Sequence, residues 1–186
     1  MASFLLLHGL EGSGPTHWQA WLAGRLRERG EQVSFPSLPE ADNPRLDRWL
    51  VALEEEIERL PAAETTVLCH SLGCLLWLHH AARGPAPAVA RALLVAPPQP
   101  DVDDPQSPGF RPTPLDREGV AAAAGETLLV CSTDDPWGPP ETARRIGEAI
   151  GAPIDWLTDA GHVSSPAYGP WPALEAWAVG ERAHPV

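Results

Sequence analysis

One serine of this sequence stands where a protein chain can turn a hydroxyl into a nucleophile. Ser71 lies in Cys69-His70-Ser71-Leu72-Gly73, between an apolar run typical of a strand and an apolar stretch typical of a helix. In a Gly-x-Ser-x-Gly elbow, a sharp strand-to-helix turn strains the serine backbone and lifts the Oγ atom above the sheet. Gly73 fits this pattern, whereas Cys69 replaces the first glycine. Serine is also a common helix N-cap, so the motif alone leaves both interpretations open.

A carboxylate and an imidazole each follow a later apolar run. Asp134 and Asp135 stand before Pro136, and His162 comes directly after a glycine. Two adjacent aspartates cannot both point at one imidazole. We favour Asp135, because the following proline fixes its neighbour and directs the turn toward the sheet end. Asp134 is then a turn-stabilising or solvated residue, and an ordinary acidic turn before a helix is the structural alternative for the pair.

The elements that must position these side chains alternate between strand and helix. Apolar runs predict strands at 4–7, 33–35, 65–69, 92–96, 127–131 and 154–157. Helical spacing predicts helices at 15–30, 44–60, 74–82, 141–150 and 171–179. Such alternation predicts an α/β fold, a mostly parallel sheet of about six strands with helices on both faces. Residues 1–186 are expected to form one domain, with little room for a second.

The three candidate residues all fall where a parallel sheet binds its ligands. Ser71, Asp135 and His162 each follow a predicted strand, and ligands bind at the carboxyl ends of strands in open α/β sheets. Their chain order is that of the α/β-hydrolase fold and differs from the chymotrypsin-like and subtilisin-like orders. The constellation predicts a serine nucleophile, a histidine base and an aspartate that orients the base.

Further candidates surround this site. The glycine-rich loop at 8–14 lacks the Lys-Ser/Thr ending of a P-loop and the dinucleotide-binding pattern. Next to the elbow it is expected to supply the backbone N–H of Leu10 to an oxyanion hole, with the N–H of Leu72 as the second donor. The Pro-rich segment 97–125 is predicted to cover the active site. His8, Phe110 and Trp137 are candidate pocket residues, and core packing is the equal alternative for the aromatic ones.

Other histidines receive structural roles from the sequence. His70 precedes the nucleophile and is expected to support the elbow. His17 could approach the mouth of the pocket, but we assign it to a helix surface.

Composition excludes several classes of function. The 186 residues carry a net charge of −12, and every basic side chain is arginine, so no basic stripe is present for nucleic acid. No apolar run is long enough for a membrane span, and the first residues lack the features of a signal peptide. The three cysteines lie in apolar stretches and match no zinc pattern, which favours buried thiols. We expect a cytoplasmic protein.

With these residues assembled, the chain resembles the retinoblastoma-binding-protein-9-like family of small serine hydrolases. The matching segments are His8-Gly9…Gly12-Ser13, Thr16-His17-Trp18, His70-Ser71-Leu72-Gly73, Gly109-Phe110-Arg111-Pro112, Asp134-Asp135-Pro136-Trp137 and Gly161-His162. The resemblance implies catalytic roles for Ser71, Asp135 and His162 and a compact fold without a lipase-type lid. It implies hydrolysis without specifying a physiological substrate.

The sequence thus predicts an esterase-like enzyme. Acyl transfer from a small ester-like substrate to water needs no metal or organic cofactor. Carboxylesterase activity is the prediction we favour, and amidase or thioesterase activity would use the same three residues. The alternative is a binding module that keeps the fold with an idle triad and engages a protein partner through segment 97–125.

Overall fold

A single parallel sheet organises the computed structural model, which describes residues 2–84, 87–164 and 168–186. Within these ranges the sheet has six strands in the order β2-β1-β3-β4-β5-β6, and every neighbouring pair is parallel. The strands are β1 (Ser3–Leu7), β2 (Gln32–Ser34), β3 (Thr65–His70), β4 (Val89–Val95), β5 (Ala124–Ser132) and β6 (Ile154–Leu157). The predicted α/β fold and its six strands are confirmed.

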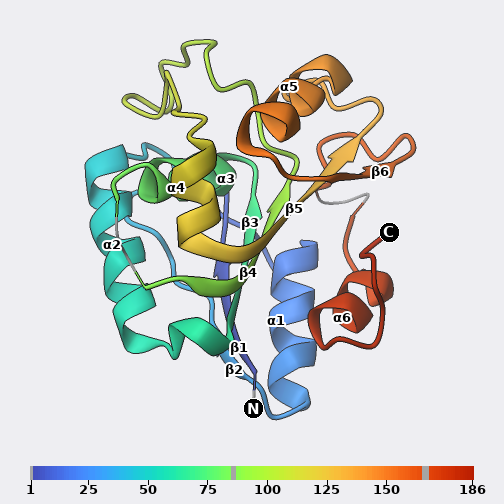
Figure 1. The fold of residues 1–186 in the computed structure, drawn as a ribbon. Helices are drawn as coiled ribbons and strands as arrows, with labels where there is room; N and C mark the ends of the chain where they lie inside the picture. Colours follow the sequence, from blue (N-terminus) through green and yellow to red (C-terminus); the bar gives the residue numbers. More distant parts are fainter. Residues whose placement is uncertain (1, 85–86, 165–167) are drawn as a thin grey trace.

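Helices cover both faces of this sheet (Figure 1). In the described part of the chain they are α1 (Trp18–Glu28), α2 (Leu46–Arg59), α3 (Leu72–Ala81), α4 (Arg117–Ala123), α5 (Pro140–Ile150), α6 (Pro172–Ala178) and the 3-10 helix η1 (Ala62–Glu64). One core joins the sheet to α2, α3, α4 and α5, and a second core joins its other face to α1 and α6. Alternate residues of the central strands therefore point into different cores, as in Leu5 and Leu6 of β1.

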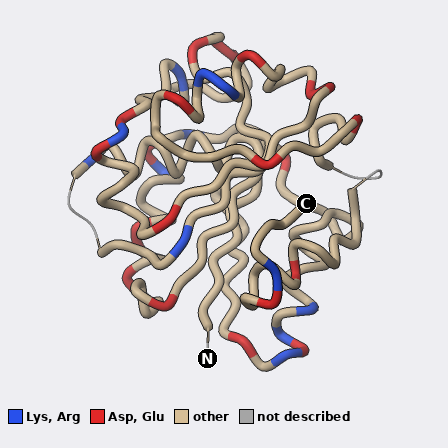
Figure 2. The backbone as a smooth tube through the Cα atoms, turned by 45° about the vertical axis from the view of Figure 1, so that its right-hand side comes forward, with Lys and Arg blue, Asp and Glu red and all other residues tan. Residues whose placement is uncertain are grey.

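Burial on both faces explains the apolar runs within the central strands. All five residues of β1 and all six of β3 are buried. Charged residues fall mainly on helices and loops around the outside, and the strands in the middle contain few (Figure 2). This arrangement matches the expectation for a parallel sheet that is covered on both sides.

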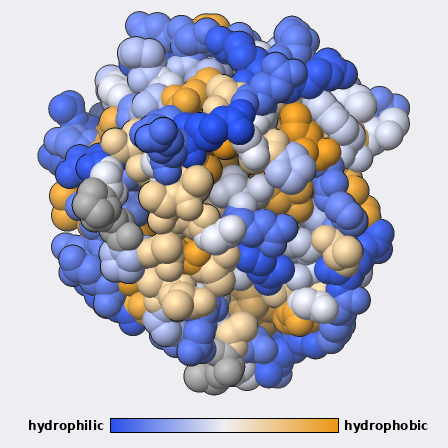
Figure 3. All heavy atoms as spheres, viewed as in Figure 1, coloured by the Kyte–Doolittle hydropathy of each residue, from blue (hydrophilic) through white to orange (hydrophobic). Residues whose placement is uncertain are grey.

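Segment 97–125 contains a helix that sequence periodicity did not reveal. α4 is short and rich in alanine, and Asp116 caps it by accepting a hydrogen bond from the Glu118 N–H. Val120 and Ala123 are buried against α3, while Ala121 and Ala122 are exposed. In Figure 3 a mildly hydrophobic band crosses the middle of the visible face, where α4 lies in Figure 1. The part of the segment before α4 arches over the carboxyl ends of the strands (Figure 1).

In the described residues, no helix combines the length and hydropathy needed to cross a membrane.

Candidate active site

Ser71 occupies a strained turn between β3 and α3. Its backbone has φ 51° and ψ −120°, a conformation that is rare for a residue with a side chain and is found at functional sites. A Cβ atom on Gly73 would lie 2.5 Å from the carbonyl oxygen of Leu7 and 2.7 Å from that of His8. Only glycine allows α3 to pass so close to the end of β1. Cys69 is fully buried within β3, so the elbow forms with cysteine at the position where glycine is usual.

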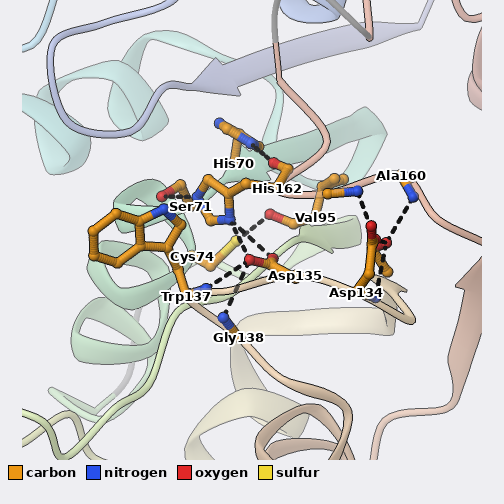
Figure 4. A network of polar contacts seen from close by, with 12 residues as sticks. His70, Ser71, Cys74, Val95, Asp134, Asp135, Trp137, Gly138, Ala160 and His162 are labelled. Carbon is orange, nitrogen blue, oxygen red and sulfur yellow. Dashed lines mark hydrogen bonds and ion pairs between the residues drawn. The ribbon is translucent and has the colours of Figure 1, made fainter.

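The imidazole of His162 lies between Ser71 and Asp135 (Figure 4). Its Nε2 atom is 2.7 Å from the Ser71 Oγ, and its Nδ1 atom is 3.0 and 2.9 Å from the two carboxylate oxygens of Asp135. Nδ1–H therefore donates to the carboxylate, which leaves Nε2 as the acceptor for the serine hydroxyl. Three residues that are far apart in sequence meet at one edge of the sheet.

Asp135 is held rigidly by the turn that follows β5. The residue is 2% exposed, and its Oδ1 atom accepts the backbone N–H of Trp137 at 2.9 Å and of Gly138 at 3.3 Å. These bonds turn the carboxylate toward the His162 ring (Figure 4). This turn therefore places the Asp135 carboxylate beside the imidazole of His162.

Asp134 contacts the backbone of the loop that carries His162 and not the imidazole ring. Its Oδ1 atom accepts the Ser132 hydroxyl at 2.6 Å and the Gly161 N–H at 2.7 Å. These hydrogen bonds lower the pKa of the Asp134 carboxyl below its ordinary value. Ser132 Oγ in turn accepts the Ala160 N–H at 2.9 Å. The expectation of a turn-stabilising or solvated residue missed this link to the loop that carries His162.

The loop after β1 packs directly on Ser71. A Cβ atom on Gly9 would lie 2.8 Å from the Cβ of Ser71 and 3.3 Å from its Oγ. Leu10 and Leu72 both line the same cavity as Ser71. Leu72 is the first residue of α3, where backbone N–H groups have no partner within the helix. An oxyanion hole made by these two N–H groups stays a prediction.

A cavity of about 550 Å³ opens beside Ser71 and His162, which both belong to its lining. Trp137 belongs to its lining and is 63% exposed. Segment 97–125 contributes Pro98, Asp104, Gln106, Ser107 and Arg111 to the lining.

Two of the predicted pocket residues lie elsewhere. Phe110 is fully buried and packs edge-on against Trp49, with ring centroids 5.3 Å apart. His8 is also buried: its Nδ1–H donates to the Gly9 carbonyl at 2.8 Å, and its Nε2 accepts the Leu38 N–H at 3.0 Å. Neither side chain belongs to the cavity lining, so we correct both assignments. Tertiary packing decides these side-chain directions, and sequence position does not.

Two other histidines line the cavity instead. His17 is only 5% exposed and caps α1, since its Nδ1 atom accepts the Gln19 N–H at 3.2 Å. The assignment of His17 to a helix surface was wrong, and the alternative position near the pocket is the one that the structure shows. Burial, together with the nearby His162 and His8, lowers the pKa of His17 to about 4. His70 lies between His17 and His162, with ring centroids 4.7 and 5.2 Å away. The segment Thr16-His17-Trp18, which belongs to the family resemblance, was the sequence signal that could have placed His17 at the site.

The part of the chain that the structure describes contains no group of three or more His, Cys, Asp or Glu side chains able to hold a metal ion.

Comparison with known proteins gives a consistent result. The sequence profile of a family described as serine hydrolase matches residues 4–178. YdeN of Bacillus subtilis (strain 168), which bears the name of a hydrolase, is 36% identical over 78 residues. That match spans 40% of this chain and 40% of YdeN, so it covers less than half of the relative's length.

Solved structures show the same fold over nearly the whole chain. The crystal structure of B. subtilis YdeN superposes with a TM-score of 0.86 at 22% identity and covers 97% of this chain and 98% of that one. A YdeN-like hydrolase from Pectobacterium atrosepticum gives a TM-score of 0.74 at 24% identity, with 96% and 91% covered. These likenesses confirm the predicted α/β-hydrolase fold.

Proposed function

Since the chain belongs to the serine hydrolase family, we propose that it cleaves ester-like acyl substrates through a triad of Ser71, His162 and Asp135. One observation carries the proposal: His162 Nε2 lies 2.7 Å from Ser71 Oγ while both Asp135 oxygens lie within 3.0 Å of Nδ1. A base within hydrogen-bond reach of the nucleophile, itself oriented by a third group, is the geometry of an activated serine.

The first half-reaction forms an acyl-enzyme. Ser71 Oγ attacks the carbonyl carbon as His162 Nε2 takes the hydroxyl proton, and the imidazolium then gives that proton to the leaving alcohol. Asp135 keeps the proton of Nδ1 in place and stabilises the positive ring. The tetrahedral oxyanion accepts the N–H groups of Leu10 and Leu72, and the contact of Gly9 with Ser71 supports this assignment.

The second half-reaction returns the enzyme to its starting state. A water molecule attacks the acyl carbon while His162 Nε2 takes a proton from it. The second tetrahedral intermediate expels Ser71 Oγ, which regains its proton from His162, and a carboxylic acid leaves. Every proton that moves passes through one imidazole.

The cavity favours a small acyl substrate and hence a carboxylesterase-like activity. Its apolar side chains are Leu10, Leu72, Pro98 and Trp137, and most of the remaining lining is polar or glycine. A short acyl group would fit against the four apolar residues, whereas a long acyl chain would also contact the polar side chains beside them. Amide and thioester bonds would be cleaved by the same steps. We also propose membership of the retinoblastoma-binding-protein-9-like group, on the sequence segments that resemble it.

The test compares hydrolysis of p-nitrophenyl acetate, butyrate and dodecanoate by the native protein and by Ser71→Ala. We expect turnover of the two short esters, a much lower kcat/KM for the long one, and loss of all turnover in S71A. Ser34→Ala is the matched control, because Ser34 lies on the edge strand β2 and its hydroxyl bonds Glu56. Absence of turnover in the native protein, together with absence of labelling by a fluorophosphonate, would instead favour a binding module with an idle triad.

A further inference from the structure

We propose that His70 is a positioning residue for the reaction, because its Nε2–H holds the backbone carbonyl of His162 and so keeps the His162 ring beside Ser71. This inference rests on the proposed function of the triad. The distance from His70 Nε2 to the His162 carbonyl oxygen is 2.9 Å (Figure 4). His70 is the last residue of β3 and Ser71 follows it directly. One end of β3 therefore positions the nucleophile through the chain and the backbone of His162 through a hydrogen bond.

The direction of this hydrogen bond fixes the tautomer of His70. A backbone carbonyl only accepts, so the Nε2 atom of His70 must carry the hydrogen. Burial, followed by the neighbouring His162 and His17, holds the pKa of His70 well below its ordinary value. A neutral ring that donates from Nε2 is therefore the state required near neutral pH.

The His70 ring is itself fixed in place. It is 5% exposed, and it packs edge-on against His17 at 4.7 Å and against Trp18 at 6.0 Å between ring centroids. Trp18 is fully buried in the core that joins the sheet to α1 and α6. The donor is thus anchored to the rigid centre of the fold and not to a surface loop.

The loop that carries His162 needs such an anchor. Gly161 and Val163 flank the base with φ values of 55° and 50°, and the left-handed region is strongly disfavoured for a β-branched residue such as valine. Asp134 and Ser132 bind the N–H groups of the two residues just before the base. His70 holds the carbonyl of the base itself. Removing this contact would let the loop relax and move the ring of His162 away from Ser71.

Two substitutions separate the hydrogen bond from the volume of the ring. His70→Phe keeps a planar ring without the donor, whereas His70→Gln can place an amide N–H near the position of Nε2. We expect H70F to lower kcat per active site about 100-fold, with KM within about threefold of native, because a shift of about 1 Å in a catalytic group costs that much. H70Q should recover most of the loss. Active sites are counted by fluorophosphonate titration, so misfolded protein does not contribute.

Two kinetic outcomes would overturn the proposal. In one, H70F keeps kcat per titrated site within about twofold of native. In the other, H70F and H70Q lose activity equally, which would assign the loss to packing.

The native protein offers a readout that does not depend on a variant folding or on catalysis. Long-range ¹H–¹⁵N correlation of the imidazoles near pH 7 should show His70 as the Nε2–H tautomer. An Nδ1–H tautomer or a protonated ring would overturn the proposal. If the native protein lacks hydrolytic turnover, the proposed function fails while this spectrum still tests the hydrogen bond. If turnover is normal and the spectrum shows an Nδ1–H tautomer or a protonated ring for His70, only the inference about His70 fails.

Discussion

Asp135 and His162 meet at a single ring nitrogen, with both carboxylate oxygens 2.9–3.0 Å from Nδ1. The carboxylate is buried, and two backbone N–H groups of its own turn fix its orientation. Because Nδ1 must then carry the hydrogen, Nε2 is left free to accept the proton of Ser71. In the proposed mechanism this contact leaves Nε2 of His162 as the base for Ser71.

Asp135→Asn should lower kcat by about 10³–10⁴-fold, because an amide can donate to Nδ1 and stabilise the wrong tautomer of His162. Asp134→Asn is the matched control. The Asn Oδ1 atom can still accept from Ser132 and Gly161, so we expect kcat within a few-fold of native. Steady-state kinetics on p-nitrophenyl butyrate distinguish the two. Loss of activity in D134N alone would show that the other aspartate orients the base.

Gly73→Ala should reduce the free energy of unfolding by about 3 kcal/mol, because the added Cβ meets two backbone carbonyls of β1 and its loop that cannot move aside. Urea denaturation followed by far-UV circular dichroism measures the change.

Gly24→Ala is the control for that substitution. Gly24 lies within α1, and an added Cβ there would have no neighbouring heavy atom within 4 Å outside its own helical turn, so alanine should raise the stability by about 0.5–1 kcal/mol. Equal effects of the two substitutions would contradict the close approach of α3 to β1.

Stability should fall as the pH is lowered from about 6.5 to about 4. The pKa of His17 drops from its ordinary value of 6.5 to about 4 in the folded protein, so between these values the unfolded chain binds more protons. This contribution is fully present above pH 6.5 and is lost as the pH falls toward 4. We expect His17 to account for about 2 kcal/mol over that range.

His17→Asn isolates the contribution of His17 to the pH dependence of stability, since asparagine is a good N-cap and does not titrate. The slope of unfolding free energy against pH between 4 and 6.5 should become shallower in the variant. His8 and His70, whose pKa values are also lowered by burial, keep part of the slope. An unchanged slope would contradict a buried, neutral His17.

Trp137→Ala should raise KM about fivefold with kcat nearly unchanged. The side chain lines the cavity and is mostly exposed, so its removal takes away about 1 kcal/mol of substrate contact and little stability. The backbone N–H that bonds Asp135 remains in the variant. Trp137→Phe should retain a KM near native. A fall in kcat at constant KM would contradict a role in binding.

The strands and the positions of the three candidate residues could be predicted from the sequence, because the patterns that indicate them are local. The buried strands β1 and β3 each contain an apolar run, and each catalytic candidate lies in the turn or loop that follows a strand. Since parallel strands end at one edge of a sheet, Ser71, Asp135 and His162 could be brought together from order alone.

Other parts of the site depend on contacts between distant residues. His8 and Phe110 point into the core because Trp49 and Leu38 offer them partners there. The helix α4 forms without an apolar period because Asp116 caps it and two residues pack on neighbouring helices. The hydrogen bond of His70 joins residues 92 positions apart, and no local pattern reports such a pair.

Covalent labelling tests the triad most directly. The native protein is incubated with a fluorophosphonate near pH 7.5, and the modified residue is located by tandem mass spectrometry. We expect one equivalent of label on Ser71, no label in Ser71→Ala, and labelling slowed by several orders of magnitude in His162→Ala. A label on another residue, or labelling of Ser71 at the same rate in H162A, would contradict activation of the serine by that imidazole.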